Sequence, residues 1–358
     1  MYSINYSSSN FSINELYHPY AEQFNKIFVH VSYPLLTALY FFMTFTILMK
    51  STKAMRIYKY LLIYQVTCCY IWELAFFLCE PMMLWPMKMG YCNGYLSGHD
   101  SAKIALPTVL CATVGVLHSN IALFIYRLAA TYDHRQFISK IVQPKILFCL
   151  VISTFILCEA LVLCLILIDP VRVEDMQEAF KDEISALRTI FELHPFTAGY
   201  HPSLSNGLID WLLLIAAVAA YIFPPLLILL CGFYYWRLIY IRKRIAISSY
   251  KLHKMLFKAL FAQTSTVVIF VFIPFEIITL LIIFQVKEGS LYTSELLVFC
   301  NFHLFVDIMS QFYFIKPYRN FLLKIIFKIR RTSVNSTTEQ KSEMEAQRAT
   351  TTNIHKGN

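Results

Sequence analysis

Ionisable side chains inside long apolar stretches are the residues of this chain whose types and spacing could do chemistry. Glu73 and Glu80 lie seven residues apart in one such stretch, so they would share a face of a helix. His303 and Asp307 lie four apart in another stretch and would share a face in the same way. Because an ionisable group is expensive to keep away from water, such groups usually contact a polar ligand or ion, relay protons, or bond to a neighbouring helix.

A fourth acidic residue, Glu276, and an aromatic residue, Trp72, complete this set. Glu276 follows Pro274, whose missing N–H favours a kink in a helix and leaves a carbonyl free. Asp307 would lie deeper in the bundle and could serve as a switch or an ion site. The predicted ligand-binding residues are Trp72, Glu73, Glu80, Glu276, His303 and Asp307. The competing interpretation is that these side chains only hydrogen-bond neighbouring helices, as polar groups in membrane bundles often do.

Long apolar stretches must position these residues. Of the 358 residues 58% are apolar and 15% are charged, whereas roughly 25% of the residues of a soluble domain are charged. The stretches are about 20 residues or longer, enough to cross a bilayer as a helix, and they are continuous rather than alternating, which disfavours a β-barrel. We predict an all-α membrane protein, a bundle of seven transmembrane helices. The predicted spans are Phe28 to Met49, Tyr60 to Leu84, Ala102 to Tyr126, Ile146 to Ile168, Leu208 to Trp236, Ala259 to Phe284 and Leu296 to Ile315.

Basic residues predict the orientation of the seven spans, because short cytoplasmic loops keep their positive charge during insertion. With the N-terminus outside, the three inner connections carry fifteen lysines and arginines and the three outer ones carry six. Asn5 and Asn10 each begin an Asn-X-Ser sequence, which could be glycosylated only if the N-terminus is luminal. We therefore predict an extracellular N-terminus, a cytosolic C-terminus and N-glycans on Asn5 and Asn10.

An amphipathic segment follows the seventh span. Past Pro317, apolar residues from Tyr318 to Ile329 recur at i, i+3, i+4, i+7, i+8 and i+11, so they line one helical face. Most of the basic residues fall on the other side, which is typical of a helix lying in the inner interface against anionic lipids. The alternative is a frayed end of the seventh span with a basic stop. The predicted division is 1–27 extracellular N-terminus, 28–315 seven-transmembrane domain, 316–331 amphipathic surface helix and 332–358 disordered cytosolic tail.

Cysteine positions argue against one kind of cross-link. Nine of the ten cysteines fall inside the predicted apolar stretches, where cysteine acts as a small apolar residue. Cys92 lies in a polar loop between the second and third spans, and the long loop from Asp169 to Asn206 contains no cysteine. We therefore expect no disulfide between these two outer loops.

Two short stretches resemble a known group of receptors. Residues 81–97, PMMLWPMKMGYCNGYLS, resemble the boundary between the second and third spans of nematode serpentine chemoreceptors of the Srh and Sri group, most closely the Sri class. Residues 316–322, KPYRNFL, resemble the Pro-Tyr-Arg ending shared across that group. The resemblance covers residues 28–331 and implies a chemosensory G-protein-coupled receptor. Such a receptor would bind a small-molecule cue in an outer cavity and activate a heterotrimeric G protein through basic inner loops.

The resemblance also implies which residues face the G protein. Arg127 follows Tyr126 at the end of the third span, where rhodopsin-like receptors have an acidic residue, and the seventh span lacks their Asn-Pro-x-x-Tyr pattern. The implied G-protein contacts are Arg127, Arg242, Lys243 and Arg244. For Arg127 the competing interpretation is a positive charge that only fixes topology. The implied location is the plasma membrane, including that of a sensory cilium, with membrane lipids as further partners.

Proteins of other classes could use the same residues. A transporter could use the buried acids and His303 as a proton relay, but transporters usually contain two related halves, and the sequence shows no repeat. A ligand-gated channel of the insect type has its N-terminus inside the cell, and the distribution of lysine and arginine among the connections disfavours that orientation. We predict that the chain is not an enzyme, because its histidines lack metal-ligand spacing and no phosphate loop or nucleophile motif occurs. No metal, cofactor or nucleic-acid partner is expected.

Overall fold

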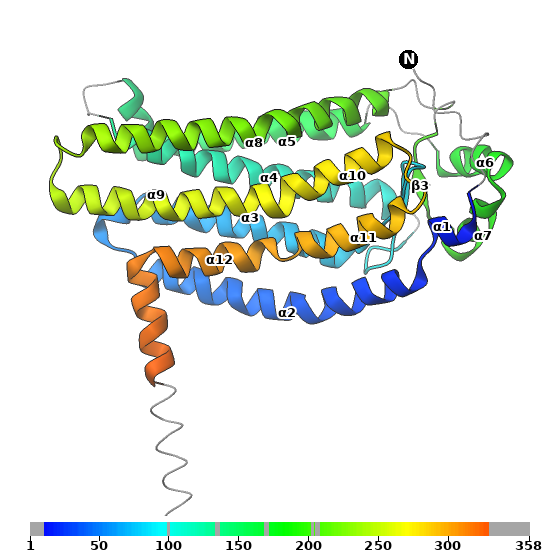
Figure 1. Cartoon of the computed structure of the whole chain (residues 1–358), viewed down its shortest axis with the longest axis horizontal. Coiled ribbons are helices and arrows are strands. Elements are labelled where there is room, and N and C mark those ends of the chain that lie inside the picture. The colour runs from blue at the N-terminus through cyan, green and yellow to red at the C-terminus, as the bar shows by residue number, and fades with distance from the viewer. Residues whose placement is uncertain are drawn as a thin grey trace, which may run out of the picture.

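Long helices run side by side along one axis, with their connections gathered at the two ends of the bundle (Figure 1). The computed structural model describes residues 11–98, 101–132, 137–167, 172–201, 204 and 208–328. The helices are α1 Ile13–Leu16, α2 Pro19–Lys50, α3 Tyr58–Cys79, α4 Ser101–Ala129, α5 Pro144–Leu167, α6 Val173–Glu183, α7 Ser185–Leu193, α8 Leu208–Ile241, α9 Ile247–Val267, α10 Ile273–Ile283, α11 Gly289–Cys300 and α12 His303–Phe314. The shorter elements are β1 Pro81–Leu84, β2 Met89–Cys92, β3 Ala198–Gly199, 3-10 turns at Lys53–Met55 and Phe137–Val142, and a π-helical turn at Val268–Phe272.

Seven stretches of the described residues are long and apolar enough to cross a membrane, which confirms the predicted number of spans. They are Ile13–Lys50, Tyr58–Cys79, Pro107–Ala129, Pro144–Cys164, Ala220–Ile241, Ile247–Ile283 and Gly289–Phe314. Several helices continue past the predicted apolar limits. Hydropathy marks where a helix can enter oil, and it does not mark where the helix itself stops.

The second span ends earlier than the sequence predicts. We predicted that it reaches Leu84, but α3 ends at Cys79 and residues Pro81–Leu84 form strand β1. Glu80 adopts a left-handed conformation with φ 40° and ψ 62°, which stops the helix. Pro81 follows and cannot donate a helical hydrogen bond. The apolar run therefore contains a helix and a strand in succession.

The helix α3 lies at the centre of the bundle and carries much of its core. Leu62, Val66, Cys69 and Trp72 are all fully buried. Two other spans depart from regular α-helix. The π-helical turn Val268–Phe272 ends two residues before Pro274, whose missing N–H favours such an irregularity. The seventh span is broken between α11 and α12.

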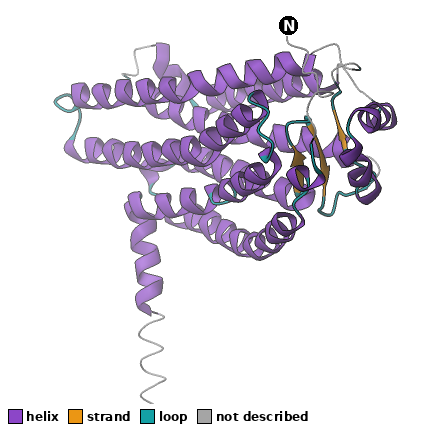
Figure 2. Cartoon of the chain, turned by 45° about the vertical axis from the view of Figure 1, so that its right-hand side comes forward, coloured by secondary structure: helices purple, strands orange, loops and turns teal. Residues whose placement is uncertain are grey.

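A small folded cap closes one end of the bundle, which we call the capped end. Strands β1 and β2 form an antiparallel hairpin, with Leu84 opposite Met89, and β3 pairs with β2 (Figure 2). Gly199 is required in β3, because a Cβ there would lie 2.5 Å from the carbonyl oxygen of Lys88. A second apolar core fills the cap, separate from that of the bundle. Its buried members are Phe11, Leu16, Met82, Leu84, Met87, Met89, Tyr91, Met176, Phe180, Ile184, Leu187, Ile190 and Phe191.

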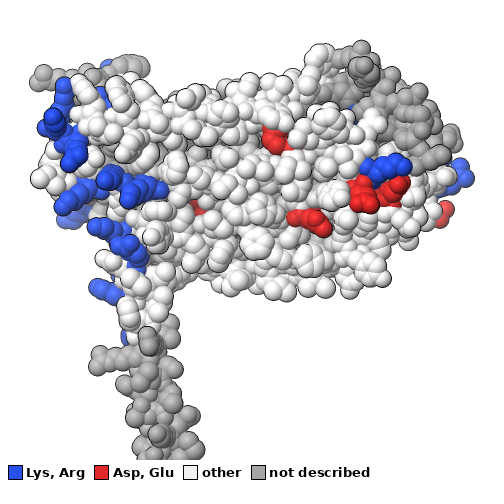
Figure 3. Space-filling model, viewed as in Figure 1, with Lys and Arg blue, Asp and Glu red and all other residues white. Residues whose placement is uncertain are grey.

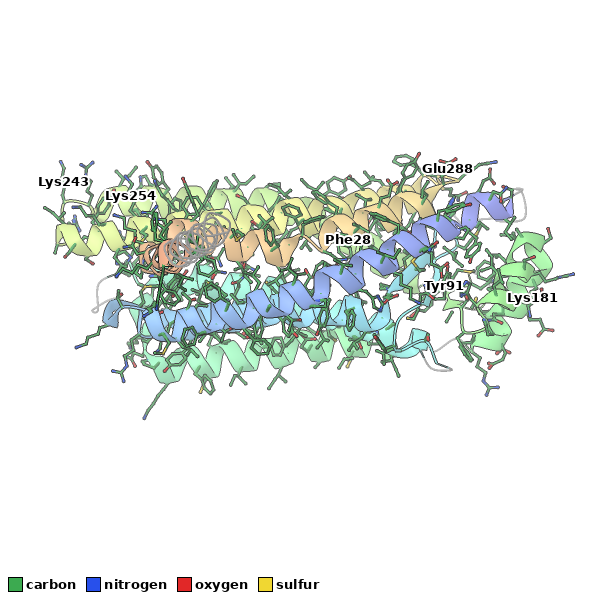
Figure 4. All side chains as sticks on the ribbon, turned by 90° about the horizontal axis from the view of Figure 1, so that it is seen from below. Phe28, Tyr91, Lys181, Lys243, Lys254 and Glu288 are labelled. Carbon is green, nitrogen blue, oxygen red and sulfur yellow. The ribbon has the colours of Figure 1, made fainter. Side chains whose placement is uncertain are left out.

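The opposite end of the bundle, which we call the basic end, carries the described connecting residues 51–57, 130–132, 137–143 and 242–246. Lysine and arginine side chains gather there (Figure 3). Lys243 and Lys254 lie at this end, whereas Tyr91, Lys181 and Glu288 lie at the other (Figure 4). Residues 316–328 form a further helix that leaves the basic end across the bundle axis (Figure 1). The Tyr318 hydroxyl contacts the Ser51 hydroxyl at 2.8 Å and ties this helix to the end of α2.

Candidate functional site

The two predicted residues Trp72 and His303 meet between the second and seventh spans. Both are fully buried, and their rings lie 6.0 Å apart, centroid to centroid, edge to face. The Trp72 indole N–H donates to the Thr113 hydroxyl of α4 over 3.0 Å. Among the described residues, neither ring nitrogen of His303 has a hydrogen-bond partner. A buried imidazole with both nitrogens unused is available to a polar ligand.

Glu73 lies against the break in the seventh span. It is 4% exposed, and its carboxyl accepts a hydrogen bond from the backbone N–H of Leu304. Leu304 is the second residue of α12, and the first N–H groups of a helix have no partner within the helix. The acid thus stabilises a break that the sequence did not reveal, because no proline or glycine marks it.

Asp307 lies in a buried group of amides further toward the basic end, which we call the amide cluster. Its Oδ2 accepts from Gln65 Nε2 of α3 over 3.0 Å and from Gln311 Nε2 over 2.9 Å. Gln65 Oε1 accepts in turn from Gln263 Nε2 of α9 over 3.1 Å. All four side chains are fully buried. The cluster therefore ties the second, sixth and seventh spans together with charge-assisted and amide hydrogen bonds.

The three glutamines of the amide cluster were missed by the sequence analysis, which followed ionisable residues alone. Two signals could have found them. Gln311 lies one helical turn after Asp307, and Gln65 lies seven residues before Trp72 on the same face of α3. A glutamine inside a span is costly for the same reason as an acid, because its amide needs partners that lipid does not offer.

Glu80 and Glu276 lie apart from this group. Glu80 stands beyond the end of α3, buried, with Oε1 3.2 Å from His30 Nδ1 of α2. Burial raises the pKa of the Glu80 carboxyl above its usual value, while His30 acts in the opposite direction. Glu276 of α10 is half-buried and contacts the Tyr221 hydroxyl of α8. The structure thus brings together Trp72, Glu73 and His303, with Asp307 below them in the amide cluster.

Two cavities among the described residues are too small for an organic ligand. One lies between α4, α8 and α9, beside Asn120 and Thr264, and holds about 10 Å³. The other lies under the cap, beside His18, Tyr91 and Ser294, and also holds about 10 Å³. That is room for about one water molecule. Neither can admit a larger ligand without movement of the helices.

Arg127 is buried near the basic end. It is 4% exposed, and its guanidinium carbon lies 3.3 Å from the centre of the Tyr58 ring. Tyr126 stacks near Tyr58 with centroids 6.3 Å apart. Nε and Nη2 of Arg127 have no hydrogen-bond partner in the described part of the chain. The cation is held largely by the π-face of Tyr58, a favourable contact when water is excluded.

The other predicted G-protein contacts are exposed. Arg242, Lys243 and Arg244 form the turn between α8 and α9, and all three side chains face outward at the basic end. The Arg244 guanidinium lies 4.5 Å from the Tyr240 ring. Asn5, Asn10 and the tail 332–358 fall outside the described residues.

One family model matches most of this chain. The model describes the serpentine type 7TM GPCR chemoreceptor Srh and matches residues 20–328, from the first span to the helix after the seventh. The chain belongs to the Srh family. This Srh receptor is therefore a multi-pass membrane protein and not an enzyme. Comparison with curated proteins and with solved structures gives no significant match.

The match refines the resemblance read from the sequence. The Srh and Sri group was expected, with Sri preferred, and the preference for Sri is not supported. The residues 81–97 on which that preference depended form the β1–β2 hairpin and the turn after it, a short segment whose shape serves the cap. Membership in the Srh family identifies this chain as a chemoreceptor.

Proposed function

We propose that this Srh receptor binds a small-molecule chemical cue near Trp72, Glu73 and His303 and activates a heterotrimeric G protein at its basic end. The observation that carries the proposal is the amide cluster, which joins three spans directly below the Trp72 and His303 rings. A cue that displaces the broken seventh span acts on α9 through Gln263. The basic end of α9 adjoins the turn with Arg242, Lys243 and Arg244.

The capped end faces outside in this proposal. The excess of basic residues in the connections of the other end supports it, since positive charge is retained on the cytoplasmic side. The Asn-X-Ser sequences at Asn5 and Asn10, which could be glycosylated only on the luminal side, favour the same orientation. The receptor would then stand in the plasma membrane, including that of a sensory cilium.

The cue selects a different conformation in this proposal, because Trp72 and His303 are both fully buried in the present one. A ligand shifts an equilibrium by the difference between its affinities for the two states. His303 offers two unused nitrogens, and Glu73 offers an oxygen, Oε1, without a hydrogen-bond partner among the described residues. A cue with both a donor and an acceptor would satisfy these atoms in the open state. Trp72 would supply an apolar surface to the cue. Glu80, Glu276 and Asp307 complete the predicted ligand-binding residues and lie further from the Trp72 and His303 rings.

Two groups of cations serve coupling in this proposal. Arg242, Lys243 and Arg244 are available to an acidic partner surface in the present conformation. Arg127 is not, because Tyr58 covers it. We therefore assign Arg127 to the open state, in which the inner ends of the spans separate and release its guanidinium to the G protein.

The helix 316–328 is proposed to lie in the inner membrane interface. Leu323, Ile326 and Phe327 are 42%, 49% and 63% exposed without a bilayer, so lipid can cover them. Its cations would contribute roughly 1 kcal/mol each near anionic headgroups. Its direction across the bundle axis suits this role (Figure 1).

Nucleotide exchange on a purified G protein tests the proposal. The variant Arg242→Gln, Lys243→Gln, Arg244→Gln should lower receptor-stimulated exchange at least tenfold at equal receptor concentration. The matched control Arg172→Gln, Lys181→Gln, Arg188→Gln removes the same charge from the capped end and should leave exchange within about twofold. Equal exchange by both variants contradicts coupling at the basic end.

The alternatives are a transporter and a ligand-gated channel. Family membership favours a receptor over both. Cells without heterotrimeric G proteins separate the three, because a receptor's response disappears there while uptake or current would persist.

A further inference from the structure

Two cysteines meet at the capped end, where the second span passes into the hairpin. Cys79 is the last residue of α3 and Cys92 is the last residue of β2. Their sulfurs are in hydrogen-bonding contact, and both residues are thiols in the structure. Thiols in contact need little rearrangement to bond, whereas cysteines whose side chains point apart cannot be bridged without moving the backbone.

Backbone hydrogen bonds hold the two cysteines beside each other. The Gly94 N–H donates to the carbonyl oxygen of Cys79 over 3.3 Å, and the Asn93 N–H donates to that of Glu80 over 3.2 Å. Pro81 and Cys92 are direct partners in the β1–β2 ladder. The backbone on both sides of the sulfurs is thus fixed, so only the two side-chain rotamers have to bring the sulfurs together.

Gly94 permits this close approach. A Cβ at this position would lie 2.5 Å from the carbonyl oxygen of Leu78 and 3.0 Å from the carbonyl carbon of Cys79. Real Cβ atoms essentially never come so near to backbone, so a larger residue would push the segment away from α3. The sequence Cys92-Asn93-Gly94 therefore brings a cysteine next to Cys79 and also supplies the residue that lets it stay there.

We propose that Cys79 and Cys92 form a disulfide bond at the capped end of the receptor. The bond rests on the proposed function in one respect, because it needs the capped end to face the oxidising lumen of the secretory pathway. It agrees with the expected absence of a link to the loop Asp169–Asn206, which contains no cysteine. The partner of Cys92 is instead the end of the adjacent helix.

The bond can form by exchange with a luminal thiol oxidoreductase that carries a disulfide. Cys92 is partly exposed and Cys79 fully buried, so the Cys92 thiolate attacks that disulfide first and releases one oxidoreductase thiol. The Cys79 thiolate then attacks the Cys92 sulfur and displaces the second thiol. The two cysteines lose two electrons and two protons, and the oxidoreductase disulfide gains them.

The bond would fasten the cap to the bundle beside the proposed cue site. The turn of the hairpin already contacts the seventh span, because the Ser290 hydroxyl donates to the carbonyl oxygen of Trp85 over 3.2 Å. With the disulfide in place, the hairpin links α3 to α11 on the capped side of Trp72 and His303. Reduction would leave the residues after β2 held to the end of α3 by backbone hydrogen bonds alone, with the contact to α11 unchanged.

Peptide mass spectrometry on the full-length receptor from a eukaryotic membrane tests the bond. The protein is denatured without reductant, free thiols are blocked with N-ethylmaleimide, and the digest is searched for a peptide pair joined through Cys79 and Cys92. We expect most of the receptor to give this pair, lighter by two hydrogen atoms than the separate peptides. Maleimide on both cysteines, or either one bonded elsewhere, overturns the proposal.

Two further measurements keep the outcome specific. An N-terminal epitope read on intact cells reports topology separately, so free thiols with an exposed epitope refute the disulfide while leaving the proposed function intact. In cells, Cys79→Ser, Cys92→Ser and the double variant should lower the surface level by the same factor, at least twofold. The control Cys149→Ser, at an exposed position on α5, should leave the surface level of the receptor unchanged. Losses that multiply in the double variant contradict a shared bond.

Discussion

The contact between Arg127 and Tyr58 should hold the receptor in its resting state, and replacing Tyr58 with leucine should raise signalling without a cue. The guanidinium carbon lies 3.3 Å from the ring centre, with Arg127 4% exposed and Tyr58 fully buried. A desolvated cation–π contact contributes about 2 kcal/mol. Tyr58→Leu removes that amount from the closed state, because leucine has no π-face.

The expected change in activity follows from this energy. Since each 1.4 kcal/mol is tenfold in an equilibrium constant, about 2 kcal/mol shifts the open-to-closed ratio roughly 25-fold. A receptor that is about 1% open at rest would become open in about a fifth of its molecules. Basal nucleotide exchange should therefore rise roughly 20-fold at equal surface expression.

Two controls separate the cation–π contact from general damage at the basic end. Tyr58→Phe keeps the ring and should leave basal exchange within about threefold of the parent. Tyr132→Leu removes the ring 4.3 Å from the Arg237 guanidinium, a less buried contact at the same end, and should change exchange little. Basal exchange that stays at the parent level in Tyr58→Leu, or rises equally in Tyr58→Phe, refutes the lock.

Three other predictions concern the amide cluster and the cap. Asp307→Leu leaves the amides of Gln65 and Gln311 without their shared acceptor, which costs about 1 to 3 kcal/mol. The melting temperature of the ligand-free receptor in detergent should therefore fall by several degrees. The control Leu323→Ala, at an exposed site after the last span, should leave the melting temperature unchanged. The His194 ring stacks on the Tyr91 ring with their centroids 3.8 Å apart, and burial lowers the pKa of the His194 imidazole below 6.5. As the pH falls through this range, the unfolded cap therefore binds a proton more readily than the folded cap does. The cap should be most stable above about pH 6.5 and become less stable as the pH falls below that value. The measurement is the rate of proteolysis of residues 172–201 at pH 7.5 and 5.5. Equal cleavage rates at the two pH values, or the same pH dependence in His194→Gln, would contradict this prediction. Gly199→Ala places a Cβ 2.5 Å from Lys88 O and should speed this proteolysis, whereas Gly98→Ala meets nothing within 4 Å and should not.

The spans could be predicted from the sequence because hydrophobic length is a direct physical requirement of the bilayer. Helix ends could not. Leu84 continues the apolar run that begins at Tyr60, but Glu80 turns the backbone to φ 40° and the next residues pair as a strand. Hydropathy does not distinguish an apolar strand of a cap from the last turn of a spanning helix.

The cap shows a second limit of the sequence analysis. The segment 172–193 was read as part of the long outer loop from Asp169 to Asn206, yet its helices α6 and α7 bury one face against the hairpin. Phe180, Ile184, Leu187 and Phe191 recur at helical spacing and could have indicated this. What the spacing could not give is the partner surface, which the hairpin supplies from a distant part of the chain.

The candidate site could be predicted in part, because the spacing of residues along a helix shows which of them share a face. The spacing of His303 and Asp307 predicts that they share one buried face of a helix, and the structure shows both side chains fully buried. The contact of Glu73 with Leu304 depends on the break between α11 and α12, which is a tertiary feature. Tyr58 was not singled out, because a tyrosine near the end of a span is ordinary until the structure places Arg127 on its ring.

The orientation of the chain is the central claim, and labelling of intact cells tests it most directly. A receptor with one epitope before residue 1 and another after residue 358 is stained with antibodies before and after permeabilisation. The account predicts that the first epitope is stained on intact cells and the second only after permeabilisation. Staining of the C-terminal epitope alone on intact cells would place the basic end outside and contradict the account.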